Sequence, residues 1–158
     1  GVAETAEDVK RRWDEIKAEE RKQKGELEQT LLEKVPRSVP ALVEAQQLTA
    51  KAATVGFDWE NADQVVEKLQ EELREMDEAR RQGSREELEG ELGDLLFVLV
   101  NLARVLKVDA EQALRKTNAK FRQRFRYVEQ QLNQRGKPLT EASLEEMEAL
   151  WQEAKQRT

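Results

Sequence analysis

The sequence predicts an all-α protein, and three features support that class. Lys, Arg, Asp and Glu make up 38% of the 158 residues, so most of the surface can be solvated. Only three prolines and seven glycines interrupt the chain, which leaves long stretches without a helix breaker. Apolar residues recur at i, i+3 and i+4 along these stretches, as they do on one face of an amphipathic helix. The length is sufficient for one hydrophobic core.

The first expected helix, residues 6–24, is highly charged, with a thin apolar stripe of Val9, Trp13 and Ile16. Residues 25–40 contain a glycine, two prolines and a serine, which predict a loop. We therefore assign residues 1–35 to a charged linker helix and loop, and residues 36–158 to a helical domain. The chain begins without methionine, so we interpret it as a piece of a longer protein.

The domain is expected to contain further helices with recognisable ends, of which about four form the core of a bundle. Ser84 with Glu87 is a capping box, and Asp109 with Gln112 and Ser143 with Glu146 repeat the spacing. Glycines at 56, 83 and 136 are typical of helix ends. These signals place helices over residues 40–55, 62–82, 85–107, 110–135 and 143–155.

The sequence lacks cysteine and histidine, and their absence excludes several classes of chemistry. No disulfide, zinc knuckle or thiol nucleophile can form without cysteine. A Ser-His-Asp triad and the Glu-x-x-His ligands of ferritin-like di-iron bundles both require histidine. An enzyme of this composition has to use carboxylates, lysine and arginine, together with a hard metal such as magnesium.

Charge and hydropathy limit the partners of the chain. A net charge of -6 argues against general binding to a nucleic acid polymer. No apolar stretch approaches the roughly 18 residues that a membrane-spanning helix needs, and no signal peptide is present. We therefore expect a cytoplasmic protein that binds neither membrane nor nucleic acid polymers.

Acidic residues on two expected helices fall beside apolar stripes, as the 100° rotation per residue shows. In residues 62–82 the stripe includes Val66 and Leu73, with Glu72 at its edge and Glu75 just beyond, whereas Glu71 points to solvent. In the following helix the expected core stripe consists of Leu88, Leu92, Leu96, Leu99 and Ala103.

Glu91 and Asp94 lie on one flank of that stripe, and the flank is apolar further along the helix. It continues with Val98, Leu102 and Val105, with Asn101 beside them. A solvated face would carry charged residues there, so we expect another helix or another subunit to cover this flank.

Carboxylates that cluster away from water are unfavourable, because desolvation and mutual repulsion both oppose their ionisation. A divalent cation offsets this cost, and hard oxygen ligands at i, i+3 on two helices are available from Glu72, Glu75, Glu91 and Asp94. Magnesium suits such a set, and manganese is a possible substitute. The alternative is that Glu-x-x-Glu and Glu-x-x-Asp are ordinary surface patterns in a chain with 33 acidic residues.

The helix over 110–135 provides positive charge beside an expected core stripe that includes Leu114 and Phe121. Lys120 and Arg124 are one turn apart at the edge of that stripe. Such a pair can bind phosphate oxygens. Alternatively, their aliphatic stems cover apolar surface while their charges stay in water.

In combination, these segments resemble the MazG family of nucleoside triphosphate pyrophosphohydrolases. The segments are "VGFDW" at 55–59, "EELRE" at 71–75, "ELGDLLF" at 91–97, "NAKFRQRFRYVE" at 118–129 and "SLEEMEALWQEAK" at 143–155. The resemblance covers most of residues 36–155. Long members of the family carry two tandem domains, and residues 6–20 are similar to the helix that joins them. Residues 36–158 then correspond to the second domain.

The resemblance implies a magnesium-dependent helical homodimer that hydrolyses a nucleoside triphosphate to the monophosphate and pyrophosphate, which removes surplus or non-standard nucleotides. It implies the same four metal ligands, phosphate contacts from Lys120 and Arg124, and places for Lys68 and Trp151 at the nucleotide. Trp151 also fits an ordinary core stripe with Leu144 and Met147. One departure is Gly90, where relatives often have an additional acid, so close approach of a helix or ligand is plausible there.

With no histidine to take a proton, a carboxylate or water activated by the metal has to serve as the base. We predict Glu75 and Glu72 as the catalytic carboxylates, with Glu75 as the base. The partner subunit is expected near Val98, Leu102 and Val105. Two alternatives remain open: a non-catalytic helical module for dimerisation or regulation, and a related enzyme with a narrower substrate.

Overall fold

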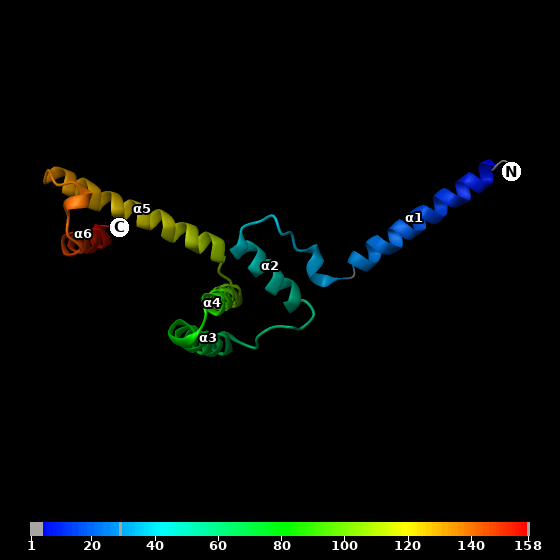
Figure 1. The fold of residues 1–158 in the computed structure, drawn as a ribbon, viewed down its shortest axis with the longest axis horizontal. Coiled ribbons are helices and arrows are strands. Elements are labelled where there is room, and N and C mark those ends of the chain that lie inside the picture. The colour runs from blue at the N-terminus through cyan, green and yellow to red at the C-terminus, as the bar shows by residue number, and fades with distance from the viewer. Residues whose placement is uncertain (1–4, 29, 158) are drawn as a thin grey trace. The chain divides into compact units, whose positions relative to one another are not determined.

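The structure, a computed structural model, describes residues 5–28 and 30–157, without the side chains of residues 25–28. Gly1, on which the interpretation as a piece of a longer protein rests, lies outside the described residues. The described residues form helices and no strand, so the all-α prediction is confirmed (Figure 1). The elements are α1 (Ala6–Glu28), η1 (Leu31–Lys34), α2 (Ala41–Ala53), α3 (Ala62–Gln82), α4 (Arg85–Val105), α5 (Ala110–Gln134), η2 (Leu139–Glu141) and α6 (Leu144–Arg157).

The predicted loop after the first helix is partly wrong. Helix α1 continues to Glu28, through the glycine that was expected to end it, and η1 adds a 3-10 turn before Pro36. The side chains of residues 5–24 are all exposed, including the stripe that contains Trp13. The boundary at residue 35 stays a prediction. The chain separates into two compact units, residues 1–107 and residues 108–158, and each is described by itself below.

In the first unit, α3 and α4 form a helical hairpin, and α2 packs against α4 (Figure 1). Gly83 and Ser84 join the two hairpin helices, and a side chain at Gly83 would lie 2.8 Å from the Ala79 carbonyl oxygen. Ser84 Oγ accepts a hydrogen bond from the Glu87 N–H at 3.1 Å, which confirms the predicted cap. Short links between helices place neighbours antiparallel, so residues near the hairpin's middle come together from both helices.

The buried face of α4 is the flank that contains Val98 and Asn101. The prediction that the stripe of Leu88, Leu92, Leu96, Leu99 and Ala103 forms the core is wrong. Val98 and Asn101 are buried, whereas Leu92, Leu96 and Leu99 are 43–55% exposed. Val66 and Leu73 on α3 are exposed as well. The prediction that the flank of Glu91 and Asp94 is covered is confirmed at Val98 and Asn101, whereas Asp94 is exposed. Within the unit, α2 and α3 pack against α4. The expectation of a partner subunit near Val98, Leu102 and Val105 stays a prediction.

The second unit is the pair α5 and α6, which pack through Val128, Leu132 and Leu150. Gly136 ends α5 with a φ of 68°, a conformation that glycine adopts without strain. Asp109 and Ser143 accept the predicted cap bonds from Gln112 and Glu146. Helix α5 is buried only near its C-terminal end, because Leu114 and Phe121 of the expected stripe are 47% and 58% exposed.

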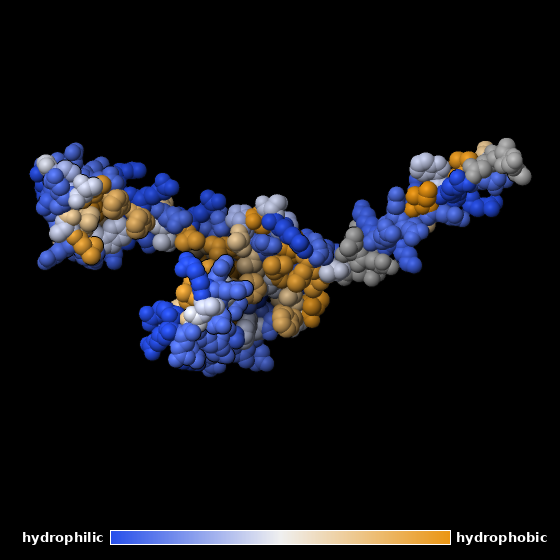
Figure 2. All heavy atoms as spheres, viewed as in Figure 1, coloured by the Kyte–Doolittle hydropathy of each residue, from blue (hydrophilic) through white to orange (hydrophobic). Residues whose placement is uncertain are grey.

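Figure 2 shows that hydrophobic side chains gather on the visible surface around α2, whereas the outer face of α3 is hydrophilic. Val55 and Phe57, which follow α2, are among the most exposed apolar residues. Across the described residues, no helix combines the length and hydropathy that crossing a membrane requires.

Candidate metal centre

The α3–α4 hairpin brings three of the four predicted metal ligands together. One carboxylate oxygen from each of Glu72, Glu91 and Asp94 lies within 4.8 Å of the other two. Glu72 is buried, Glu91 is half-buried and Asp94 is exposed, so the cluster opens from the hairpin to its surface. Glu75, one turn after Glu72 on α3, is half-buried and lies outside this group of three.

Within the described chain, two oxygens in the cluster lack a partner that a positive ion could supply. Glu72 Oε2 and Glu91 Oε2 are buried, and neither has a hydrogen-bond partner among the described residues. A buried acceptor without a partner is costly, and a carboxylate more so than a neutral group. The available donors are hard oxygens, which suit magnesium or calcium and lack the nitrogen and sulfur ligands that zinc prefers. These residues therefore fit a divalent cation.

The electrostatics of the acids support the same conclusion. Burial raises the pKa of Glu91, and the charges of Glu72 and Asp94 raise it further. The charge of Glu72 is the main cause that raises the pKa of Glu75, followed by burial and by Glu91. The charges of neighbouring acids thus oppose the ionisation of Glu75 and Glu91, and a cation among them would favour the ionised forms.

Lys68 provides the nearest positive charge. Its Nζ lies 3.1 Å from Glu72 Oε1 and 3.5 Å from Glu71 Oε2. The hydrogen bond to Glu72 is the main cause that raises the pKa of Lys68. Glu71 is exposed, as the helix geometry predicts. Lys68 contacts only one oxygen of Glu72, and it leaves Oε2 unpaired.

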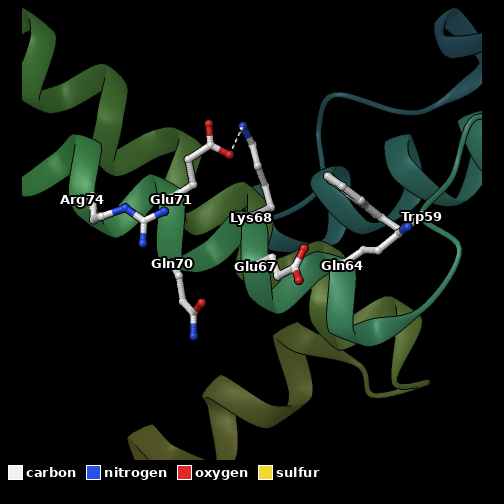
Figure 3. Close-up of a pocket in the computed structure, with 7 residues that line it drawn as sticks. All are labelled: Trp59, Gln64, Glu67, Lys68, Gln70, Glu71 and Arg74. Atoms are coloured by element: carbon white, nitrogen blue, oxygen red, sulfur yellow. Dashed lines mark hydrogen bonds and ion pairs between the residues drawn. The ribbon is translucent and has the colours of Figure 1, made fainter.

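Lys68 also lines an open pocket of about 580 Å³ on the surface of α3. Figure 3 shows Lys68 and Glu71 extending toward each other from α3, with Trp59 in the preceding loop at the other side of the pocket. The position of Lys68 between the acids and a pocket is compatible with a ligand contact, which stays a prediction.

The expectation that a helix approaches closely at Gly90 is wrong for the described residues, whereas the approach of a ligand stays a prediction. A side chain at this position would have nothing within 4 Å of its Cβ, so no helix packs there. The glycine therefore does not serve close packing, and nothing in the structure explains it.

The remaining predicted site residues belong to the second unit. Lys120 is exposed and Arg124 is half-buried on α5. Trp151 on α6 packs against the core of that unit, as the core-stripe alternative requires, and its ring centroid lies 5.2 Å from that of Phe121. Leu144 is 77% exposed and is not part of the stripe. The substrate roles of Lys120, Arg124 and Trp151 stay predictions.

Sequence reasoning missed one polar group near the acids. Arg104 on α4 forms an ion pair with Asp58 in the loop after α2, and it also donates to Asn101 Oδ1 at 2.9 Å from Nη2. Arg104 holds the pKa of Asp58 below its usual value. The signal was available in the sequence, because Asn101 and Arg104 interrupt an otherwise apolar run one turn apart.

The hairpin therefore defines an all-α protein with a carboxylate site suited to a divalent cation. Comparison with known proteins gives the family. Residues 60–128 match the model of the MazG nucleotide pyrophosphohydrolase domain. This segment contains all four acids, Lys68, Lys120 and Arg124. Residues 60–128 thus match a MazG domain, and the resemblance inferred from the sequence is confirmed.

Three relatives extend the similarity over most of the chain. The chain is 46% identical over 155 residues to the nucleoside triphosphate pyrophosphohydrolase of Escherichia coli strain K12. The aligned region covers 97% of this chain and 58% of that protein. It is 41% identical over 145 residues to the nucleoside triphosphate pyrophosphohydrolase/pyrophosphatase MazG of Thermotoga maritima. This alignment covers 92% of this chain and 54% of that protein. An uncharacterised Bacillus subtilis protein is 45% identical over 150 residues. This alignment covers 94% of this chain and 30% of that protein. The chain spans little more than half the length of the first two.

Proposed function

We propose that this chain hydrolyses nucleoside triphosphates to nucleoside monophosphate and pyrophosphate. The observation that carries the proposal is the cluster of Glu72, Glu91 and Asp94, whose unpaired buried oxygens lie in the segment that matches the MazG domain. Two of its relatives are named for this activity. Removal of surplus or non-standard nucleotides is the role that we infer from such a reaction, and a cytoplasmic location stays a prediction.

The three converging carboxylates, with Glu75 beside them, would hold magnesium, for which manganese is a possible substitute. When bound, the ion supplies positive charge to the phosphate oxygens and lowers the pKa of water. The acids would fix the position of the ion, and thereby the position of the triphosphate. Two of their oxygens are buried and have no partner among the described residues. This arrangement presents the phosphates to the open side of the hairpin, where Asp94 is exposed.

Glu75 is placed to accept the proton of the attacking water. It lies one turn from Glu72, outside the group of three, and is accessible to solvent. The water oxygen forms a bond to the α-phosphorus while the bond from that phosphorus to the bridging oxygen of pyrophosphate breaks. Glu72 is the second catalytic carboxylate, one turn before Glu75 on α3.

The basic residues and one tryptophan complete the proposed substrate site. Lys120 and Arg124 neutralise the charge that develops on the leaving pyrophosphate. Lys68 contacts the nucleotide beside Glu72, and Trp151 is a further nucleotide contact. The inclusion of Lys120 and Arg124 in the matched segment supports their part in this arrangement.

We also propose that the chain forms a homodimer through the exposed face of α4. Among the described residues, eight hydrophobic side chains are buried and eighteen large ones are exposed. Leu92, Leu96 and Leu99 recur at helical spacing, and contiguous exposed apolar surface marks an interaction site. A second copy offers the same face, so the contact can be symmetric.

The test is a product assay with magnesium and a panel of nucleoside triphosphates. We expect pyrophosphate and monophosphate in equal amounts, and none when the metal is chelated. Release of orthophosphate with a diphosphate left behind would reject the reaction. A non-catalytic helical module predicts no turnover and no effect of magnesium on stability. A panel in which a single nucleotide is hydrolysed would favour the narrower enzyme.

The site is tested by Glu75→Gln and Asp94→Asn. Each is expected to lower kcat by about 100-fold or more, because a positioned base or a metal ligand is lost. Glu78→Gln on the exposed side of α3 is the matched control and should change kcat less than about threefold. Full turnover by either site variant would reject the assignment.

A further inference from the structure

A second cavity, of about 690 Å³, lies in the first unit directly beside the acid cluster. Glu72 and Asp94 form part of its wall, together with Lys68 of α3 and residues of η1, α2, the loop after α2 and α4. Binding sites for small molecules commonly have volumes of about 300–1,000 Å³. The cavity is therefore continuous with the proposed phosphate site and large enough for an organic group attached to those phosphates.

The walls of this cavity are mostly apolar and include three aromatic residues, Phe57, Trp59 and Phe97. Phe57 is 80% exposed and Phe97 is 43% exposed, so neither ring is used in the core of the unit. Aromatic rings that stay exposed around a cavity offer stacking surface to a flat ring. A nucleobase is such a ring, and it is joined through its sugar to phosphates.

One polar group in the wall is oriented by the structure. Asn101 is 9% exposed, and its Oδ1 accepts from Arg104 Nη2 at 2.9 Å and Nε at 3.3 Å. Because a guanidinium can only donate, the amide oxygen has to face Arg104. Asp58 holds Arg104 in turn. The amide Nδ2 makes no hydrogen bond within the described chain, so its two N–H groups are available to the cavity.

We propose that this cavity binds the nucleoside part of the triphosphate, and that Asn101 is a specificity-determining residue that donates to an acceptor on the base. Asp58 and Arg104 are positioning residues, because they fix which end of the amide faces the ligand. The inference rests on the proposed function for the identity of the phosphate group, and it adds where the base is read.

The first test replaces Asn101 by Leu, which keeps the size and removes the donor. The kcat/KM for the preferred nucleotide should fall about tenfold, mainly through KM, and the differences between bases should narrow. The Kd of a non-hydrolysable α,β-methylene analogue should rise by a similar factor in calorimetry. Asn133→Leu, at an exposed asparagine of α5, is the matched control and should leave both values unchanged. An unchanged base preference in Asn101→Leu would overturn the role of Asn101.

The second test fills the cavity and does not depend on the folding of Asn101→Leu. Ala52 on α2 lines the cavity, and Ala52→Leu suits a helix while it reduces the space. Nucleotides with a purine should lose at least fivefold more kcat/KM than those with a pyrimidine. Equal losses for both would overturn the placement of the base.

The two proposals fail in different ways. If the wild-type protein releases no pyrophosphate from any nucleotide, the proposed function fails. The analogue-binding comparison between wild type and Asn101→Leu then still decides whether the cavity binds a nucleoside. If pyrophosphate is released but neither variant changes the preference for a base, the function stands and the inference about the cavity fails.

Discussion

At the residue scale, Glu91 illustrates how the acid cluster opposes the folded state when no cation is present. Its Oε2 is buried without a partner, and burial, followed by the charges of Glu72 and Asp94, raises its pKa. Unlike Glu72, it has no ion pair with a lysine among the described residues. Its contribution to stability is therefore unfavourable near neutral pH without metal and favourable with it.

We expect Glu91→Gln to raise the Tm of the metal-free protein by a few degrees, because the substitution removes one of the mutually repelling charges. The same variant should lose most of the Tm increase that magnesium gives to the wild type. Differential scanning fluorimetry with and without magnesium measures both effects. Glu89→Gln, exposed on the same helix, should behave like the wild type. A magnesium response in Glu91→Gln equal to that of the wild type would contradict its role as a ligand.

That acids would gather in this unit could be predicted from the sequence, because Glu72, Glu91 and Asp94 lie beside apolar runs on adjacent helices. Their role as metal ligands stays a prediction. The pairing of Asp58 with Arg104 could not be predicted. These residues are 46 positions apart, and only the packing of the loop after α2 against α4 brings them together.

At the scale of elements, most helix ends could be predicted from the sequence, whereas the buried helix faces could not. Caps and glycines act within four residues, so α3 begins and ends at the predicted residues, 62 and 82. Helix α4 has two adjacent apolar faces, and its periodicity alone does not distinguish them. The flank with Val98 is inside because α2 and α3 pack there.

Helices α5 and α6 depend on a small core, so Leu150→Ala should be strongly destabilising. Leu150 is 1% exposed and contacts Val128 and Leu132. Loss of a buried leucine leaves a cavity and costs about 2–5 kcal/mol. Chemical denaturation followed by helical circular dichroism measures this. Leu144→Ala, at a 77% exposed position on the same helix, should change stability by less than about 0.5 kcal/mol. If the two variants lowered the free energy of unfolding equally, the assignment of Leu150 to the core would be contradicted.

Glu146 should make a pH-dependent contribution to the stability of α5 and α6. Its carboxylate accepts from Lys137 Nζ at 2.7 Å and from Arg135 Nη1 at 3.1 Å. These contacts, Lys137 first, hold the pKa of Glu146 below the ordinary value of 4.5. Because the folded state favours the ionised form, the stabilisation is complete above pH 4.5 and is lost as the pH falls through the lowered pKa.

Glu146→Gln should therefore lower the Tm at pH 7 and have no effect at a pH well below 4.5. Thermal melts across this range measure the difference from the wild type. Glu148→Gln, at an exposed position of α6, is the matched control. A difference in Tm that is constant over the whole range would show that charge is not the cause.

At the scale of the whole molecule, the exposed leucines of α4 carry the prediction of a homodimer. Leu96→Lys places a charge on that face, so we expect the apparent mass in solution to fall from that of two chains to that of one. Sedimentation velocity at several concentrations measures it. Val55→Lys, at a position that is 68% exposed after α2, should leave the dimer intact. A wild-type protein that sediments as a single chain would contradict the proposal.

The sequence by itself determined the helical class, most helix ends and the kind of side chains that the candidate site can offer, because local hydrogen bonding and side-chain chemistry act over a few residues. Only the tertiary structure decided which face of α4 is buried, that Glu75 lies outside the closest group of acids, and that Asn101 is oriented by Arg104. The physical reason is that burial and electrostatic coupling depend on neighbours that are distant along the chain, and helical periodicity contains no information about which neighbour packs on which face.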